Sequence, residues 1–180
     1  TTMNAVAGVA NFANKGVKLT SLIGSRNLTA TIASPSAITK TNTVTVTFGA
    51  ATKLAIFTQA AGAVNGVDFT TQPVVKVQDV SGNTVSDSTA TVVASAAGVA
   101  LGGTTSKAAI NGVATFTNLK FTGTVATYSL AFASTGLTGT AHDLTLTVGA
   151  AAKLTITRAA VGFTNRVAFA VQPQISIQDA

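Results

Sequence analysis

The sequence predicts an all-β fold of tandem antiparallel β-sandwiches. Three observations support this prediction: a repeat of about 100 residues, alternation of apolar and polar residues within each copy, and the lack of any sustained helical period. The 180 residues are 47% hydrophobic and only 9% charged. This composition excludes an intrinsically disordered chain, which combines low hydrophobicity with high charge.

A repeat organises the whole chain. Residues 50–79 match residues 150–179 at 14 of 30 positions, with an offset of 100 (150 − 50). Gly8–Phe12 matches Gly112–Phe116 at an offset of 104 (112 − 8), so the first copy holds four extra residues within Ala13–Asn27. Because loops accept insertions more readily than β-ladders, we expect a surface loop there.

The repeat divides the chain into three parts. Residues 49–148 are predicted to form one complete unit, residues 1–48 the second half of a preceding unit, and residues 149–180 the opening strands of a following one. The junctions Gly49–Lys53 and Gly149–Lys153 are short, which predicts a semi-rigid string of nearly touching units. The chain begins at Thr1 without a signal peptide, so we expect a mature or internal piece of a longer protein.

Strands follow from positions that stay apolar in both copies, with polar neighbours between them. In the first half-unit the expected inward positions are Leu28, Ala30 and Ile32, followed by Val44, Val46 and Phe48 with Thr between them. Strands expected in the central unit are Lys53–Phe57, Val67–Thr71, Val74–Asp79, Ala90–Ser95, Thr105–Ile110, Val113–Thr117, Tyr128–Phe132 and Leu144–Val148. Those expected in the last part are Lys153–Thr157 and Gln174–Asp179.

Turn-forming residues separate these strands. Val80–Asn83, Asn111-Gly112 and Gly136–Gly139 are rich in the residues that accept positive φ. We interpret Ala60–Ala63 and Ala94–Ala100 as connections. Seven or eight short strands in about 100 residues are typical of an antiparallel sandwich. A parallel β-solenoid is the alternative, but its coil repeat would be much shorter.

Two segments carry a family resemblance. Val77–Val85 resembles the V-x-D-x-x-G-N-x-V segment of bacterial immunoglobulin-like repeats, as found in invasin- and intimin-type surface proteins, and Asn111–Phe116 resembles their N/D-G-x-A-x-F segment. Tyr128 stands where immunoglobulin-like domains often carry a corner tyrosine, although Leu28 replaces it in the first copy. The resemblance implies extracellular stalks, adhesins, fibres or surface layers, and it implies no active site.

Composition also restricts the function. The net charge of +6 is spread thinly, without the Lys/Arg clusters and aromatic platforms of nucleic-acid binders. A diffuse positive charge is compatible with anionic cell-surface polymers as partners. Polar residues interrupt every apolar stretch, so no membrane-spanning helix is expected. With no Cys, no Glu and one His, we expect no enzymatic activity, no catalytic residue and no cofactor.

Five candidate features carry a chemical alternative beside an ordinary one. His142-Asp143 is the only pair fit for general-base chemistry, and it opens a strand. Asp79, Ser81 and Asn83 superficially resemble an alternating run of Ca²⁺ ligands, which Asp68 and Asp87 could join only by coincidence of folding; a full loop needs more carboxylates and the chain has no Glu, so an Asx-type turn is favoured. The other three are the sequon Asn27-Leu28-Thr29, a Lys–Asn crosslink from Lys53/Lys153 and Asn65/Asn165, and Thr rows at Thr43, Thr45, Thr47, Thr145 and Thr147 that resemble ice-binding surfaces.

Low charge points to self-association. A soluble monomer surface usually carries about 25–35% charged residues, far more than this chain. We therefore expect a structural segment of an extracellular bacterial filament, sheath or surface layer, whose partners are further copies of itself. Half-units completed by strands of another copy are one version of this hypothesis, and a piece of a longer array is the other. The alternatives are an adhesin stalk whose tip lies elsewhere and an accessory module of a secreted carbohydrate-active enzyme.

Overall fold

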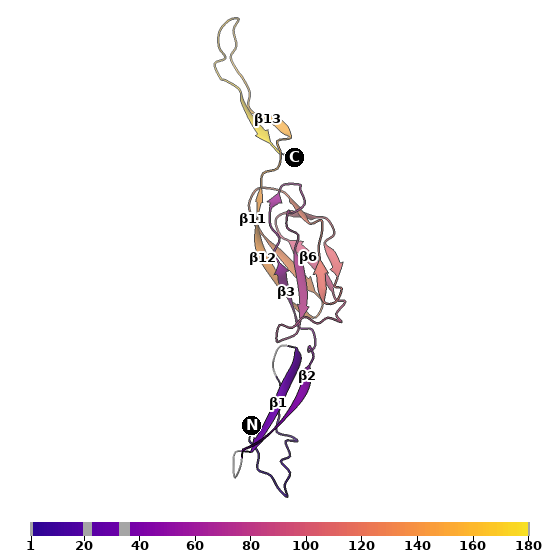
Figure 1. Ribbon diagram of the computed structural model, residues 1–180. Coiled ribbons are helices and arrows are strands. Elements are labelled where there is room, and N and C mark those ends of the chain that lie inside the picture. Colours follow the sequence, from indigo (N-terminus) through magenta and orange to yellow (C-terminus); the bar gives the residue numbers. More distant parts are fainter. Residues whose placement is uncertain (1, 20–22, 33–36, 180) are drawn as a thin grey trace.

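The computed structural model describes residues 2–19, 23–32 and 37–179. These residues form fourteen β-strands and no α-helix, so the all-β prediction is confirmed. Figure 1 shows an elongated string, in which the hairpin of β1 and β2, a central sandwich-shaped body and the β13 hairpin follow one another. Nothing in the described part of the chain is a helix long and apolar enough to cross a lipid bilayer.

The central body contains ten strands, β3 to β12. Two groups of them face each other across one core: β9, β5 and β3 on one side, and β8, β6, β11 and β12 on the other. The groups join where β12 pairs in parallel with β3, and β4 pairs in parallel with the far end of β12. The bounds are β3 Lys53–Thr58, β4 Ala63–Val64, β5 Val74–Gln78, β6 Thr91–Ala96, β7 Ala100–Gly102, β8 Ser106–Ala108, β9 Val113–Thr115, β10 Lys120–Thr122, β11 Thr127–Ser134 and β12 Leu137–Thr147.

Side chains from both groups fill the core. Alternation places Val75 and Val77 of β5 inward, as predicted, opposite Leu130 and Phe132 of β11, and all four are buried. Phe121 lies among them and meets the ring of Phe69 edge-to-face at 5.0 Å. Burying an apolar side chain of this size stabilises a fold by about 1.5–3 kcal/mol, so this cluster supplies the main stabilising free energy of the unit.

The last part repeats the pairing register of the central body, whereas the first part does not: Leu28 lies opposite Asn42, but Tyr128 lies opposite Leu144. In the last part, β13 Lys153–Arg158 pairs with β14 Gln174–Gln178 in the register of β3 with β5, including the same irregularity one residue before the end of the first strand. In the first part, β1 Gly24–Ile32 pairs antiparallel with β2 Ile38–Val46. Antiparallel pairing dominates throughout, unlike the ladders of a parallel solenoid.

Several strand predictions were wrong. Val67–Thr71 forms only isolated bridges, while the two- and three-residue strands β4, β7 and β10 were not predicted. A strand this short does not establish a period-two pattern by itself; β8 and β9, with three residues each, were predicted only within the longer ranges Thr105–Ile110 and Val113–Thr117. Ala94–Ala100 is not a connection throughout: it begins inside β6, because Ala94 fills a buried core position, and it ends in β7.

The two predicted boundaries show a further difference. Val148 was expected to point inward, but β12 ends at Thr147 and Val148 is exposed. Similarly, β2 ends at Val46, and Phe48 packs against the core of the central body instead of its own half-unit. The predicted insertion range, 13–27, includes residues 20–22, which lie outside the described residues; β1 begins within it, at Gly24. The unit boundaries themselves stay predictions.

Candidate functional site

The acidic residue of the turn after β5 accepts hydrogen bonds from protein groups. Asp79 is buried, and its carboxylate accepts hydrogen bonds from the backbone N–H of Gly49 at 2.9 Å and of Asn83 at 2.8 Å, and from the Asn83 side-chain amide at 2.9 Å. The Gly49 bond is the main cause that lowers the pKa of Asp79 from 3.8 to about 2. Three protein donors therefore occupy the oxygens that a Ca²⁺ ion would need, which fits the Asx-type turn.

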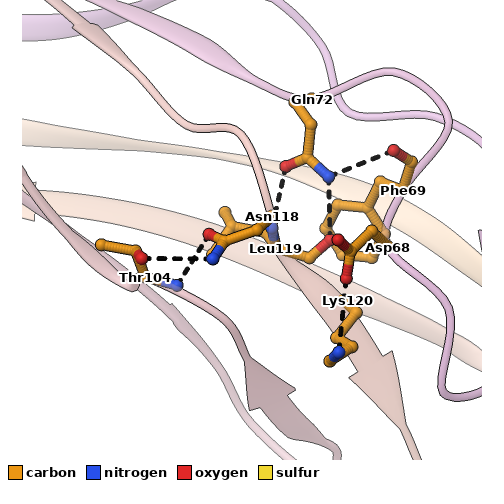
Figure 2. Close-up of polar contacts among 7 residues, drawn as sticks. All are labelled: Asp68, Phe69, Gln72, Thr104, Asn118, Leu119 and Lys120. Atoms are coloured by element: carbon orange, nitrogen blue, oxygen red, sulfur yellow. Dashed lines mark hydrogen bonds and ion pairs between the residues drawn. The ribbon is translucent and has the colours of Figure 1, made fainter.

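The other acidic residues do not join this turn. Asp68 instead forms an ion pair with Lys120 at 3.4 Å (Figure 2). Gln72 is itself committed, because it accepts from the N–H of Leu119 and donates to the carbonyls of Phe69 and Leu119. Among the described residues, no three His or Asp side chains gather in a group that could hold a metal ion.

The pair His142-Asp143 lies in the middle of β12 and does not open a strand as predicted. The Nε2 of His142 accepts the N–H of Ala60 at 3.3 Å, in the segment that links β3 to β4. Its Nδ1 lies 3.3 Å from the backbone carbonyl oxygen of Asp143, so the ring contacts the main chain and not the Asp143 carboxylate. His142 therefore supports the path of the first strands rather than a catalytic pair with Asp143.

The predicted modification sites also find ordinary partners. Asn27 is exposed, but it lies within β1 and accepts a hydrogen bond from the Thr43 hydroxyl at 3.1 Å. Lys53 donates to the carbonyl of Val80 at 3.4 Å, whereas Asn65 contacts Asp179 and Gly123. The structure thus gives Lys53 and Asn65 different partners.

Lys153 lines the same cleft as Asn65 and Asp179, but its side chain is exposed to solvent. A lysine that reacts as a nucleophile needs a desolvated setting, so this exposed position does not favour the Lys–Asn crosslink.

The Thr rows pair their hydroxyls across strands. Thr127 and Thr145 approach to 2.9 Å, and Thr29 and Thr41 to 3.0 Å. Thr147 donates its hydroxyl to the carbonyl of Ala63 at 3.0 Å. Hydroxyls committed to each other are typical of the solvent face of a β-ladder, where such pairs contribute about 0.2–1 kcal/mol each.

The surfaces that stand out are the apolar sheet faces of the two flanking parts. Leu54 of β3 is 4% exposed, whereas Leu154, its counterpart 100 positions later, is 70% exposed. The same holds for Val77, which is fully buried, and Ile177, which is 70% exposed. The register places Leu154 opposite Ile177 and Ile156 opposite Ile175, so these four side chains form one apolar face, here called the C-terminal face.

The first part carries a matching surface. A groove of about 1040 Å³ runs between residues 2–17 and the β1–β2 hairpin. Leu28 and Ile32 correspond to core positions of β11 and line this groove, here called the N-terminal groove. Its other apolar lining residues are Met3, Phe12, Val17 and Ile38. Both surfaces present residues that the central body buries, and these are the candidate functional surfaces of the chain.

Comparison with known proteins finds similar solved structures but no matching sequence family. The sequence matches no protein-family model, and no curated protein matches it either. Two solved structures of Parabacteroides merdae β-glucuronidase are similar in structure, one with glycerol in its active site. Their TM-scores are 0.43 and 0.42, at 15% and 16% sequence identity, over 68% of this chain. The chain spans only 16% of the length of those enzyme chains.

Proposed function

We propose that this chain is a non-enzymatic structural segment of tandem immunoglobulin-like repeats, which builds an extracellular bacterial filament, sheath or surface layer. The observation that carries the proposal is the exposure of Leu154 and Ile177, whose counterparts Leu54 and Val77 are buried in the central body. Contiguous exposed apolar faces mark surfaces that another protein surface covers. The chain's own repeat indicates what fits there, since the strands β3 and β5 cover the corresponding face of β11 and β12.

The immunoglobulin-like interpretation has two supports in the central body. Its first strand is split, with β3 on one group of strands and β4 parallel to the last strand on the other. Tyr128, near the start of β11, donates its hydroxyl to the carbonyl of Thr124 at 2.6 Å. A tyrosine that bonds back to the backbone a few residues upstream is a hallmark of immunoglobulin-like domains.

In this proposal the C-terminal face of one copy docks in the N-terminal groove of another, which completes a sandwich between subunits. Both surfaces are apolar, and strand addition supplies backbone hydrogen bonds as well as apolar burial. The weak, dispersed positive charge opposes close approach little in salt, because the Debye length is about 8 Å at physiological ionic strength.

The test combines electron microscopy with a pair of matched variants. Ile156→Lys places a charge on the C-terminal face, whereas Thr155→Lys places it on the opposite face of β13. We expect ordered fibres or sheets from the unmodified chain and from Thr155→Lys, and dispersed particles from Ile156→Lys. Isolated, flexible strings from all three would refute the assembly and leave the adhesin-stalk alternative.

A further inference from the structure

The passage from the central body to the last part is bridged by a side-chain amide. Asp179 follows β14, and its Oδ2 accepts the N–H of Gly149 at 2.8 Å. The same oxygen accepts the side-chain amide of Asn65 at 3.0 Å. Asn65 lies in the turn after β4 of the central body, so this bond joins two units across 114 residues of sequence.

The bridging amide is held in one orientation. Its Oδ1 accepts the N–H of Gly123 at 2.9 Å, and the backbone N–H of Asn65 donates to the carbonyl of Thr147 at 3.0 Å. The units also approach closely, because a Cβ added at Gly149 would lie 2.9 Å from the carbonyl oxygen of Asn65. Glycine at this position therefore permits a contact that any other residue would push apart.

The same order of bonds occurs at the preceding passage. There Oδ2 of Asp79 accepts the N–H of Gly49 and the amide of Asn83, both at 2.9 Å. Oδ1 of Asn83 in turn accepts the N–H of Ile23 at 3.3 Å, and Ile23 lies 100 positions before Gly123 (123 − 23). At this passage Asp79 and Asn83 belong to the same unit, and the bond from Ile23 to Asn83 joins it to the preceding unit. At the other passage the bond from Asn65 to Asp179 itself joins the two units.

We propose that this order of bonds is a docking joint between successive units, in which the carboxylate recognises one asparagine amide and thereby fixes the orientation of one unit on the next. Its partner is a following unit of the same kind, with Gly at its start and Asp thirty positions later (79 − 49 and 179 − 149). The inference rests on the tandem-unit part of the proposed function, and not on assembly between chains.

Electrostatics support the joint. The N–H of Gly149 and the amide of Asn65 lower the pKa of Asp179, and the nearby charge of Lys153 adds to the effect. Asp179 is therefore ionised at neutral pH, and hydrogen bonds to an ionised acceptor are about twice as strong as neutral ones. An open cleft of about 680 Å³ lies at this joint, lined by Asn65, Lys153 and Asp179 among others.

The test is NMR on the dispersed 180-residue chain, with Asn65→Ala as the variant. Asn165→Ala is the matched control, because it changes the corresponding asparagine of the last part. Residual dipolar couplings report whether residues 53–147 and the β13–β14 hairpin share one orientation. We expect a shared orientation in the unmodified chain and the control, and its loss in Asn65→Ala. Amide exchange at Gly123 should become about 2- to 10-fold faster, as the loss of one hydrogen bond predicts.

Two results would overturn the joint: a shared orientation that survives in Asn65→Ala, or independent orientations already in the unmodified chain. If Asn65→Ala disturbs the central body, Asp179→Ala removes the same bond from the other side and must give the same loss. A chain that forms no fibres but keeps an ordered joint refutes the filament and leaves the joint intact, so the two proposals fail separately.

Discussion

At the scale of single residues, Asp79 shows how a buried charge is retained. Burial alone would favour the neutral acid, but three hydrogen-bond donors stabilise the carboxylate more than burial destabilises it. The donors come from Gly49 and Asn83, so the charge links the segment before β3 to the turn after β5. A neutral residue of similar shape would lose the hydrogen bonds to a charged acceptor.

Stability should therefore depend on Asp79 at low pH. Because its pKa is lowered from 3.8 to about 2 in the folded state, its contribution is complete above pH 3.8 and is lost as the pH falls through about 2. We expect urea unfolding of the central body to show this loss. Asp79→Asn should be less stable at neutral pH and should lack this part of the acid sensitivity. Asp87→Asn is the control, because Asp87 is exposed and lies outside the hydrogen bonds of the turn. If the stability of Asp79→Asn fell with pH in the same way as that of the unmodified chain, Asp79 would not be the source of the acid sensitivity.

Sequence could predict part of this residue-level picture. The Ser, Gly and Asn residues of Val80–Asn83 predicted a turn after Asp79, and the structure has a turn there. The bridging role of Asn65 was missed, because a polar residue in a turn contributes nothing to a period-two pattern and its partner, Asp179, lies 114 residues away. One signal was available: Asn65 and Asp79 both recur in the second copy, at Asn165 and Asp179.

At the scale of elements, the hairpin turn at Asn111-Gly112 has the same backbone geometry as the earlier turn at Ala7-Gly8. Both residues have positive φ, 52° and 72°, and Ile110 and Val113 exchange backbone hydrogen bonds across them. Ala7-Gly8 has φ of 50° and 80° and the same exchange between its neighbours. This is the two-residue turn whose twist suits antiparallel strands.

The surroundings of the two glycines predict different costs. A Cβ at Gly112 would overlap the carbonyl of Val85, whereas one at Gly8 would meet nothing within 4 Å. Both substitutions by alanine carry the left-handed strain of about 1–2 kcal/mol, but only Gly112→Ala adds the overlap. We expect Gly112→Ala to lower the unfolding midpoint of the central body in urea and Gly8→Ala to leave it unchanged. Equal midpoints for the two variants would show that neither the strain nor the overlap at position 112 destabilises the central body.

Element prediction succeeded where two copies could be compared. The strands β3 and β5 were predicted because Leu54, Ile56, Val75 and Val77 stay apolar 100 positions later. It failed for β4, β7 and β10, whose pairing partners are distant and whose length is two or three residues. Strand formation there depends on tertiary contacts such as β7 with β10, which a local pattern does not contain.

At the scale of the whole molecule, one sequence pattern appears in two environments. The central body buries a set of apolar positions that both flanking parts expose, although β13 and β14 of the last part pair in the same register as β3 and β5. Alternation therefore specified the strands and their inward faces correctly, but not which surface covers them. Which surface covers these apolar positions depends on the neighbours of each flanking part. In the assembly proposal the neighbour is another copy of the chain.

The parallel pairing of β4 with β12 has a mechanical consequence. The chain enters the central body at one end and leaves it at the other, as Figure 1 shows, so tension along the string pulls these two strands in opposite directions along their length. The bonds between them, including Asn65 N–H to Thr147 O at 3.0 Å, then share the load in shear instead of breaking one by one. Single-molecule pulling should find a high rupture force that falls in Thr147→Pro or other variants that disrupt this pairing; rupture at an unchanged force would place the resisting contacts elsewhere. A string of such units would behave as a tether that holds its length under flow.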